Sequence, residues 1–166
     1  MKKLSDAQNI AEELLLKNYQ RYYRLAYSYV KNEQDALDVV QESAYKAIKK
    51  CQKIKEASYM ETWIYRVVIN TALDFLRRSN RETPTPDAWE VQYQDEYADI
   101  DLMKAMYQLE EKERAVVVLR FFEDRKLEEI AEITEENVNT VKSRMYRALK
   151  KLKVHLSEEE ERSAGL

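Results

Sequence analysis

The sequence is poor in the two residues that interrupt helices. Among 166 residues there is one glycine, Gly165, and there are two prolines, Pro84 and Pro86. In a helix interior, glycine costs about 1 kcal/mol and proline about 3 kcal/mol relative to alanine. Because almost nothing interrupts a helix before residue 83 or after residue 87, the sequence predicts an all-α fold.

Cysteine and histidine are equally scarce, with Cys51 and His155 the single examples. One cysteine excludes an internal disulfide and a cysteine-rich zinc site, and it fits a reducing compartment. With no ligand set near His155 and no glycine-rich loop to hold phosphate, we expect no cofactor, metal, small-molecule substrate or catalysis by the chain alone. The N-terminus has no apolar run long enough for a signal peptide or membrane span, so we expect a cytoplasmic protein without membrane insertion.

The sequence does contain long stretches of helical periodicity, which fall into two halves. They cover residues 10–30, 33–50 and 59–78, and then 102–152. Residues 82–101 between them carry seven acidic side chains and no basic one, and their Thr-Pro-Thr-Pro step disfavours helix. The sequence therefore predicts two small helical domains, residues 1–80 and 101–155, joined by an acidic flexible linker at 81–100 and followed by a frayed tail at 156–166.

Positive charge is concentrated near the end of a chain whose net charge is −3. The stretch VNTVKSRMYRALKKLK, residues 138–153, has six basic residues, no acidic one, and apolar residues on one side of a helix. Asn137 is well placed as its N-cap. A shorter amphipathic stretch, KLEEIAEI, precedes it across a tight turn. Two helices joined in this way predict a helix-turn-helix, whose second helix enters the major groove of DNA.

The same residues carry a family resemblance. LEEIAEITEENVNTVKSRMYRALKKLK is similar to region 4 of extracytoplasmic-function (ECF) sigma factors of the sigma-70 family, through its E-I-A-E, T-V-K-S-R and R-A-L segments. The resemblance implies that the second helix binds the minus-thirty-five promoter duplex. Lys and Arg would neutralise phosphates, and Asn, Ser and Arg would read base edges. The contacts expected on this basis are Asn139, Thr140, Lys142, Ser143, Arg144, Arg147 and Lys151.

Two positions depart from the family pattern. Many members carry glycine in the turn, where this chain has Glu135, and again before the Thr-Val pair, where it has Asn139. Glu135 must therefore either adopt a strained positive φ or belong to a turn of another shape. Asparagine tolerates that backbone region better than glutamate.

The N-terminal half also resembles the family. DALDVVQE, residues 35–42, is similar to a helix of region 2 that, in these sigma factors, docks on the clamp helices of the largest RNA polymerase subunit. Periodicity places Ala36, Leu37 and Val40 on the buried side, leaving polar side chains for a partner. The expected polymerase-binding residues are Asp35, Asp38, Gln41, Glu42 and Tyr45. For Asp35 we weigh the alternative that it only stabilises the helix N-terminus behind an Asn32 cap.

A second part of region 2 is matched by residues 58–78, where Trp63-Ile64-Tyr65-Arg66 fits the W-L-Y-R of the family. In these proteins this helix and the loop before it melt and hold the minus-ten element. That task needs positive charge for the backbone and stacking surfaces for unpaired bases. The residues expected to do so are Lys53, Lys55, Trp63, Tyr65, Arg66, Asn70, Arg77 and Arg78. For Trp63 and the many tyrosines, core packing is the competing interpretation.

The resemblance implies a cytoplasmic initiation subunit, nucleoid-associated when active, with core RNA polymerase and promoter DNA as partners. It also implies an anti-sigma factor, in many members anchored in the membrane, that holds the protein there until a stress signal. Two other hypotheses stay open at this point. A polymerase-independent helix-turn-helix regulator predicts dimers and palindromic sites but leaves DALDVVQE unexplained. A helical module binding an acidic protein or a membrane predicts no promoter-specific activity.

Overall fold

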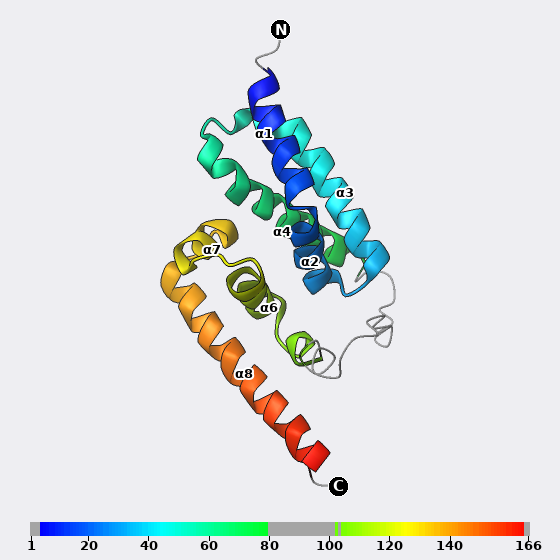
Figure 1. Ribbon diagram of the computed structural model, residues 1–166, viewed down its shortest axis with the longest axis vertical. Coiled ribbons are helices and arrows are strands. Elements are labelled where there is room, and N and C mark those ends of the chain that lie inside the picture. The colour runs from blue at the N-terminus through cyan, green and yellow to red at the C-terminus, as the bar shows by residue number, and fades with distance from the viewer. Residues whose placement is uncertain (1–3, 80–101, 103, 165–166) are drawn as a thin grey trace. The chain divides into compact units, whose positions relative to one another are not determined.

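The computed structural model describes residues 4–79, 102 and 104–164, and every regular element in these ranges is helical. The chain divides into two compact units. One contains α1 to α4, and the other contains α6, η3, α8 and most of α7. An all-α fold of two small helical domains is thus confirmed, while the predicted acidic linker lies outside the described residues (Figure 1).

The N-terminal domain consists of four main helices: α1 (Leu4–Lys17), α2 (Tyr19–Val30), α3 (Glu33–Lys50) and α4 (Met60–Ser79). Two short 3-10 turns, η1 (Cys51–Lys53) and η2 (Ala57–Tyr59), connect α3 to α4. Helices α2, α3 and α4 each pack against the other two, and α1 lies along α3 (Figure 1). The largest fully buried side chains of this core are Tyr22, Leu25, Val39, Met60, Ile64, Tyr65 and Val68.

The single helix predicted over residues 10–30 is two helices, because the backbone changes direction at Asn18 (φ −107°, ψ 20°). Its amide is buried and donates to the Tyr22 hydroxyl at 3.4 Å. Tyr22 and Tyr29 are buried, as core packing of the tyrosines predicts, whereas Tyr23 and Tyr27 are half-buried and Tyr19 is 39% exposed. Burial of the Asn18 amide is a tertiary effect that periodicity along the chain does not reveal.

The C-terminal domain is built from α6 (Glu111–Val117), α7 (Leu127–Thr134) and α8 (Val138–Ala164). A π-helical segment, η3 (Val118–Phe122), continues α6, and residues 104–107 form a helical turn before it. Helix α6 packs against α8 around buried apolar side chains. These are Val116, Leu119, Ile130, Ile133, Val141, Ala148 and Leu152.

Helix α8 is longer than the sequence predicted, since it continues to Ala164 through the residues expected to form a frayed tail. The prediction was wrong here, and the reason lies in the composition of the segment. No glycine or proline occurs between residue 138 and Gly165, so nothing in the sequence ends the helix earlier.

Candidate polymerase and promoter interfaces

Helix α3 presents a polar stripe to solvent. Asp38, Gln41 and Tyr45 are exposed, and their spacing of three and four residues places them on one side of the helix. The Tyr45 side chain is 66% exposed, and the Lys49 ammonium lies 5.6 Å from its ring centroid. On the opposite side, Ala36, Val39, Val40 and Ala47 are buried. The stripe offers acceptors, donors and one large aromatic surface to a partner.

Asp35 lies in the first turn of α3, where its backbone N–H donates to the Asn32 side chain at 2.9 Å. The predicted Asn32 cap is therefore confirmed. Partial burial, and then the negative charge of Asp38, raise the pKa of Asp35 above its ordinary value. These contacts give Asp35 a role at the helix N-terminus, whereas Asp38 stands free of the backbone.

Glu42 and Arg78 were predicted for different partners but form an ion pair with each other. The Arg78 Nη2 lies 3.3 Å from a Glu42 carboxylate oxygen, and the two side chains are 64% and 39% exposed. The pair links the exposed edge of α3 to the last turn of α4. Its neighbour Arg77, 73% exposed, pairs with Asp74 at 2.9 Å along α4.

The candidate minus-ten surface combines α4 with the connection before it. Lys53, Lys55 and Asn70 are exposed, and Trp63 is half-buried. Arg66 is also half-buried; its guanidinium lies 5.4 Å from the Tyr59 ring centroid and donates to the Tyr59 hydroxyl. Positive charge and aromatic surface, the two features that unpaired DNA requires, therefore occur together in this domain.

Tyr65 is a correction to the predicted contacts. Its side chain is 0% exposed, and its ring packs edge to face against Tyr22 with centroids 5.3 Å apart. A ring enclosed in this way cannot stack on a base without unfolding the domain. Tyr65 is a core residue, and the neighbouring Trp63 is the aromatic side chain that reaches the surface.

The turn between α7 and α8 closes with two backbone hydrogen bonds. The N–H of Glu136 donates to the carbonyl of Ala131 at 2.9 Å, and the N–H of Glu135 donates to the carbonyl of Glu132 at 3.3 Å. This pattern is a Schellman motif, which needs a left-handed residue after the helix. Glu135 supplies it with φ 58°, so the strained alternative predicted for this residue is the one adopted. Asn139 instead lies within α8, in the right-handed region.

Replacing Glu135 by glycine should raise the free energy of unfolding of the C-terminal domain by about 0.5–1 kcal/mol. A non-glycine residue pays roughly 1–2 kcal/mol in the left-handed region, and the greater chain entropy of glycine offsets part of the gain. Urea denaturation followed by circular dichroism measures the change. The matched control is Glu132→Gly, inside α7, which should destabilise by about 1 kcal/mol. If both variants lowered the free energy of unfolding by the same amount, the backbone at Glu135 would not be strained.

The start of α8 is fixed by side chains from the turn. Asn137 accepts from the Asn139 backbone N–H at 2.7 Å, which confirms the predicted cap. Arg144 forms an ion pair and hydrogen bond with Glu136, and both side chains are mostly buried, at 17% and 22% exposure. Arg144, predicted to read bases, is thus held against the turn in the free protein.

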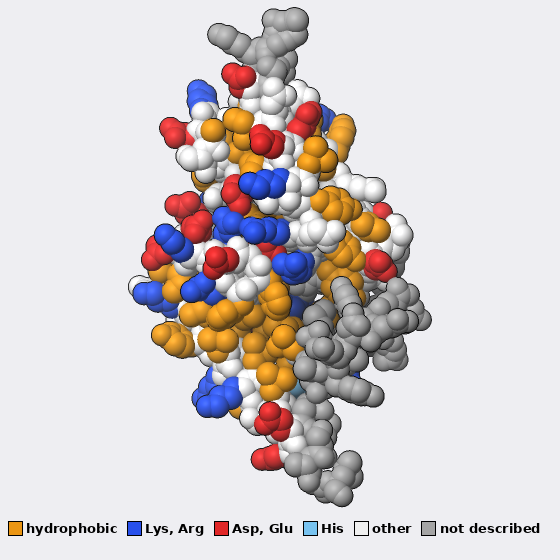
Figure 2. Space-filling model, viewed as in Figure 1, with side chains coloured by type: hydrophobic (Ala, Val, Ile, Leu, Met, Phe, Trp, Pro, Cys, Tyr) orange, Lys and Arg blue, Asp and Glu red, His pale blue; other side chains and the backbone are white. Residues whose placement is uncertain are grey.

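The outward side of α8 combines basic, polar and aromatic side chains. Asn139, Lys142 and Ser143 are exposed, Arg147 has an exposed fraction of 59%, and Thr140 is half-buried. Tyr146, at 69% exposure, lies among them. Hydrophobic and basic side chains lie side by side over α8 on the face shown in Figure 2. This mixture can contact both phosphates and base edges, including the thymine methyl group.

A buried carboxylate joins α6 to α8. Glu113 has a side-chain exposure of 3%, and its oxygens lie 2.8 and 3.2 Å from the Lys151 ammonium and 3.8 Å from Arg147 Nε. It also accepts from the Glu110 backbone N–H at 3.2 Å, as half of a capping box at the start of α6. Burial alone would raise the pKa of Glu113, but the Lys151 and Glu110 hydrogen bonds and the two cations lower it. Lys151, predicted as a DNA contact, therefore has an internal partner.

Comparisons with known proteins match each half of the chain to a described protein family. Residues 14–82 match the family described as Sigma-70 region 2, and residues 99–152 match Sigma-70, region 4. The chain is 42% identical over 164 residues to the RNA polymerase sigma factor SigV of Bacillus subtilis (strain 168), covering 96% of this chain and 99% of that protein. This chain belongs to the sigma-70 family, in its ECF group.

More distant relatives extend the likeness. The ECF RNA polymerase sigma-E factor of Haemophilus influenzae (strain ATCC 51907 / DSM 11121 / KW20 / Rd) is 30% identical over 157 residues, or 83% of each chain. The sigma factor RpoE of Bartonella quintana, solved with the anti-sigma factor NepR, shares the fold with a TM-score of 0.75 at 23% identity; the match covers 88% of this chain and 96% of that one. The protein is an RNA polymerase sigma factor, and regulation without polymerase is not favoured.

Two residues of the candidate interfaces did not stand out in the sequence. Tyr146 belongs to no segment that the family resemblance singled out, and its 69% exposure follows from how α8 packs. Glu113 carried no signal, since nothing in the sequence pairs it with a lysine 38 residues later. Within the described part of the chain, no helix is long and apolar enough to cross a membrane.

Proposed function

We propose that this sigma factor binds core RNA polymerase through the exposed stripe of α3 and contacts promoter DNA with α4 and α8. The observation that carries the proposal is the exposure of Asp38, Gln41 and Tyr45 on a helix whose other side is core. Partners with this chemistry are helices bearing basic and amide side chains. Membership of the sigma-70 family supports RNA polymerase as the partner that carries such helices.

Replacing Asp38 and Gln41 together by alanine should weaken binding to core polymerase about tenfold or more. Each change removes one exposed polar group from the centre of the docking stripe, and neither group is part of the domain core. Fluorescence anisotropy of N-terminally labelled protein titrated with core polymerase measures the affinity. Gln8→Ala with Glu12→Ala is the matched control on α1, where the Gln8 amide donates to the Glu12 carboxylate at 3.1 Å. If the double variant assembled holoenzyme like wild type, α3 would not be the docking face.

For the promoter, the proposal assigns the minus-ten element to α4 and the loop before it. Lys53, Lys55 and Arg77 supply exposed positive charge for the backbone of the open strand. Trp63 and the Tyr59–Arg66 pair supply ring surface for unpaired bases. The minus-thirty-five duplex is assigned to the outward side of α8, where Lys142 and Arg147 contact phosphates and Ser143 and Tyr146 contact base edges.

Arg147→Gln should reduce the slope of log affinity against log salt for duplex DNA by about 0.9, because one phosphate contact and its released counterion are lost. The measurement is a salt titration of duplex binding by the full chain. Lys126→Gln removes another exposed cation, ahead of α7, and should leave the slope unchanged. Tyr146→Ala should lower affinity for the preferred duplex with an unaltered slope. An unchanged slope in Arg147→Gln would remove this residue from the interface.

We further propose that an anti-sigma factor regulates this protein by covering these surfaces. The sigma factor RpoE was solved with the anti-sigma factor NepR, and CnrH, which shares the fold with a TM-score of 0.71 at 21% identity, was solved in complex with the cytosolic domain of CnrY. Such a partner, where anchored in a membrane, would hold the protein at the cytoplasmic face until released to the nucleoid. Affinity capture with the Asp38→Ala, Gln41→Ala variant against wild type tests whether one surface serves both partners.

A further inference from the structure

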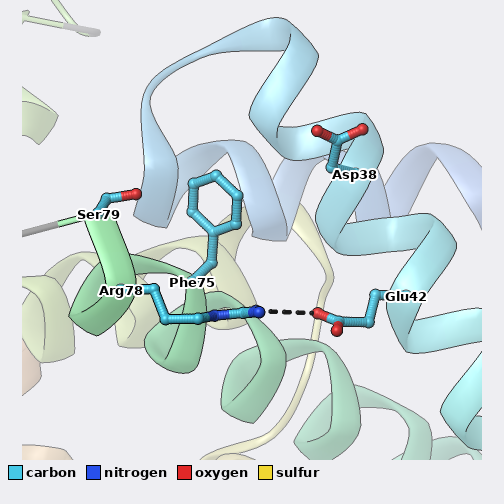
Figure 3. Close-up of a pocket in the computed structure, with 5 residues that line it drawn as sticks. All are labelled: Asp38, Glu42, Phe75, Arg78 and Ser79. Atoms are coloured by element: carbon cyan, nitrogen blue, oxygen red, sulfur yellow. Dashed lines mark hydrogen bonds and ion pairs between the residues drawn. The ribbon is translucent and has the colours of Figure 1, made fainter. Parts of the chain in front are cut away.

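A cavity of about 390 Å³ lies between α3 and α4 in the N-terminal domain. Its lining residues are Asp38, Glu42, Phe75, Arg78 and Ser79. Figure 3 shows Arg78 reaching from α4 toward Glu42 on α3, with the Phe75 ring beside it. The cavity adjoins the exposed stripe of α3, because Asp38 belongs to both.

The Glu42–Arg78 ion pair, which lines this cavity, can exchange partners readily. It consists of one Arg78 nitrogen at 3.3 Å from one Glu42 oxygen, and both side chains are open to water. Exposed pairs of this kind contribute little to stability and are screened by salt. A competing cation brought to Glu42 by a docked partner can therefore replace Arg78 at small cost.

The two members of the pair belong to surfaces with different proposed partners. Glu42 lies on the helix proposed to dock on polymerase, and Arg78 lies at the end of the helix proposed to hold the open promoter strand. In the free protein each one neutralises the other. A phosphate and Glu42 thus compete for the same guanidinium, which weakens binding of DNA by the protein alone.

We propose that the Glu42–Arg78 pair is an exchangeable latch between polymerase docking and promoter binding. A lysine or arginine side chain of core polymerase enters the cavity, takes Glu42 as its partner and frees Arg78 for the phosphates of the open strand. The proposal rests on the docking of polymerase through α3.

The cavity fits a long basic side chain. Asp38 and Glu42 are four residues apart on α3 and both line the cavity, so a cation that enters it meets a side of the helix that carries two negative charges. The Phe75 ring lines the same space and can take the cation on its face. The Asp38 carboxylate accepts from the Gln34 amide at 3.3 Å, and it is exposed. Arginine suits this site well, because its planar guanidinium can bond the Glu42 carboxylate with two parallel N–H groups and can lie over a ring.

The latch makes two reciprocal predictions, because coupling between two binding sites is mutual. Arg78→Gln removes the internal competitor and should tighten binding to core polymerase about two- to five-fold, the range that one exposed pair supports. Arg77→Gln is the matched control, since it removes the same charge one residue away and should not tighten binding. Equal affinities of the two variants for polymerase would overturn the latch.

The DNA side is tested without polymerase, on a single-stranded minus-ten oligonucleotide in low salt. Glu42→Gln should raise the affinity about two- to five-fold by releasing Arg78. Made in an Arg78→Gln background, the same change should have no effect, whereas a general gain from lost negative charge would persist in that background and overturn the latch. If Arg78→Gln matches Arg77→Gln while the Asp38, Gln41 variant loses polymerase, the latch fails and the docking proposal stands.

Discussion

Replacing Tyr65 by alanine should lower the free energy of unfolding of the N-terminal domain by about 3–5 kcal/mol. The side chain is fully buried and packs edge to face on Tyr22, so truncation leaves a cavity between α2 and α4 and removes an aromatic pair. A loss of this size is a large part of the stability of a small domain. The main defect of the variant should therefore be loss of folding stability and not loss of a promoter contact.

Unfolding of the N-terminal domain can be measured separately by tryptophan fluorescence. The chain has two tryptophans, Trp63 and Trp89, so a Trp89→Phe background leaves one fluorophore, within α4. Urea titrations of this background with and without Tyr65→Ala measure the loss. Asn70→Ala on the exposed side of α4 is the control and should cost less than about 0.5 kcal/mol. A stable Tyr65→Ala protein with a specific defect in strand opening would restore Tyr65 as a DNA contact.

Replacing Glu113 by alanine should destabilise the C-terminal domain by about 3 kcal/mol. The change removes the charge-assisted hydrogen bonds between Glu113 and Lys151, leaves a space where the buried side chain was, and removes half of the capping box of α6. Hydrogen exchange measured by mass spectrometry on peptides from α6 and α8 reports this loss separately from the other domain. Glu111→Ala, one residue into the same helix but exposed, is the control and should change exchange little.

The same carboxylate should give the domain a defined dependence on pH. Because the pKa of Glu113 is lowered in the folded protein, its contribution is complete above the unfolded pKa, near 4.5. The contribution is lost as the pH falls through the lower folded value. The difference in stability between wild type and Glu113→Gln should hence be largest at neutral pH and shrink in acid. A constant difference from pH 7 to pH 3 would show that Glu113 gains nothing from Lys151 and Arg147.

Local signals in the sequence predicted the helices well where a cap or a breaker marks the end. Helix α3 has the predicted bounds, Glu33–Lys50, because Asn32 caps it. The division of the first helix at Asn18 was not predictable, since asparagine is tolerated in helices and the deciding contact is with a buried tyrosine hydroxyl. The far end of α8 was misjudged because the last residues of the chain were expected to fray, although no breaker precedes Gly165.

The candidate site was predictable as a set of helices but not as a set of contacts. Trp63 and Tyr65 both match the family pattern, yet α4 packs against both α2 and α3, and its buried face is wide enough to enclose Tyr65. Arg144 and Arg147 are likewise two arginines of the same basic helix, and the sequence alone does not distinguish them. Packing alone separates them, because Arg144 turns toward Glu136 whereas Arg147 remains mostly exposed. Exposure and ion pairing are properties of the folded domain, which a motif match does not contain.

The central claim is that this chain supplies promoter specificity to RNA polymerase through two separate surfaces. In-vitro transcription on a pooled promoter library, with bacterial core polymerase and the protein added or omitted, tests it most directly. We expect initiation from a shared two-part motif only when the protein is present, and loss of that initiation with the Asp38→Ala, Gln41→Ala variant. Initiation that is independent of the protein, or that shows no common motif, would contradict the account.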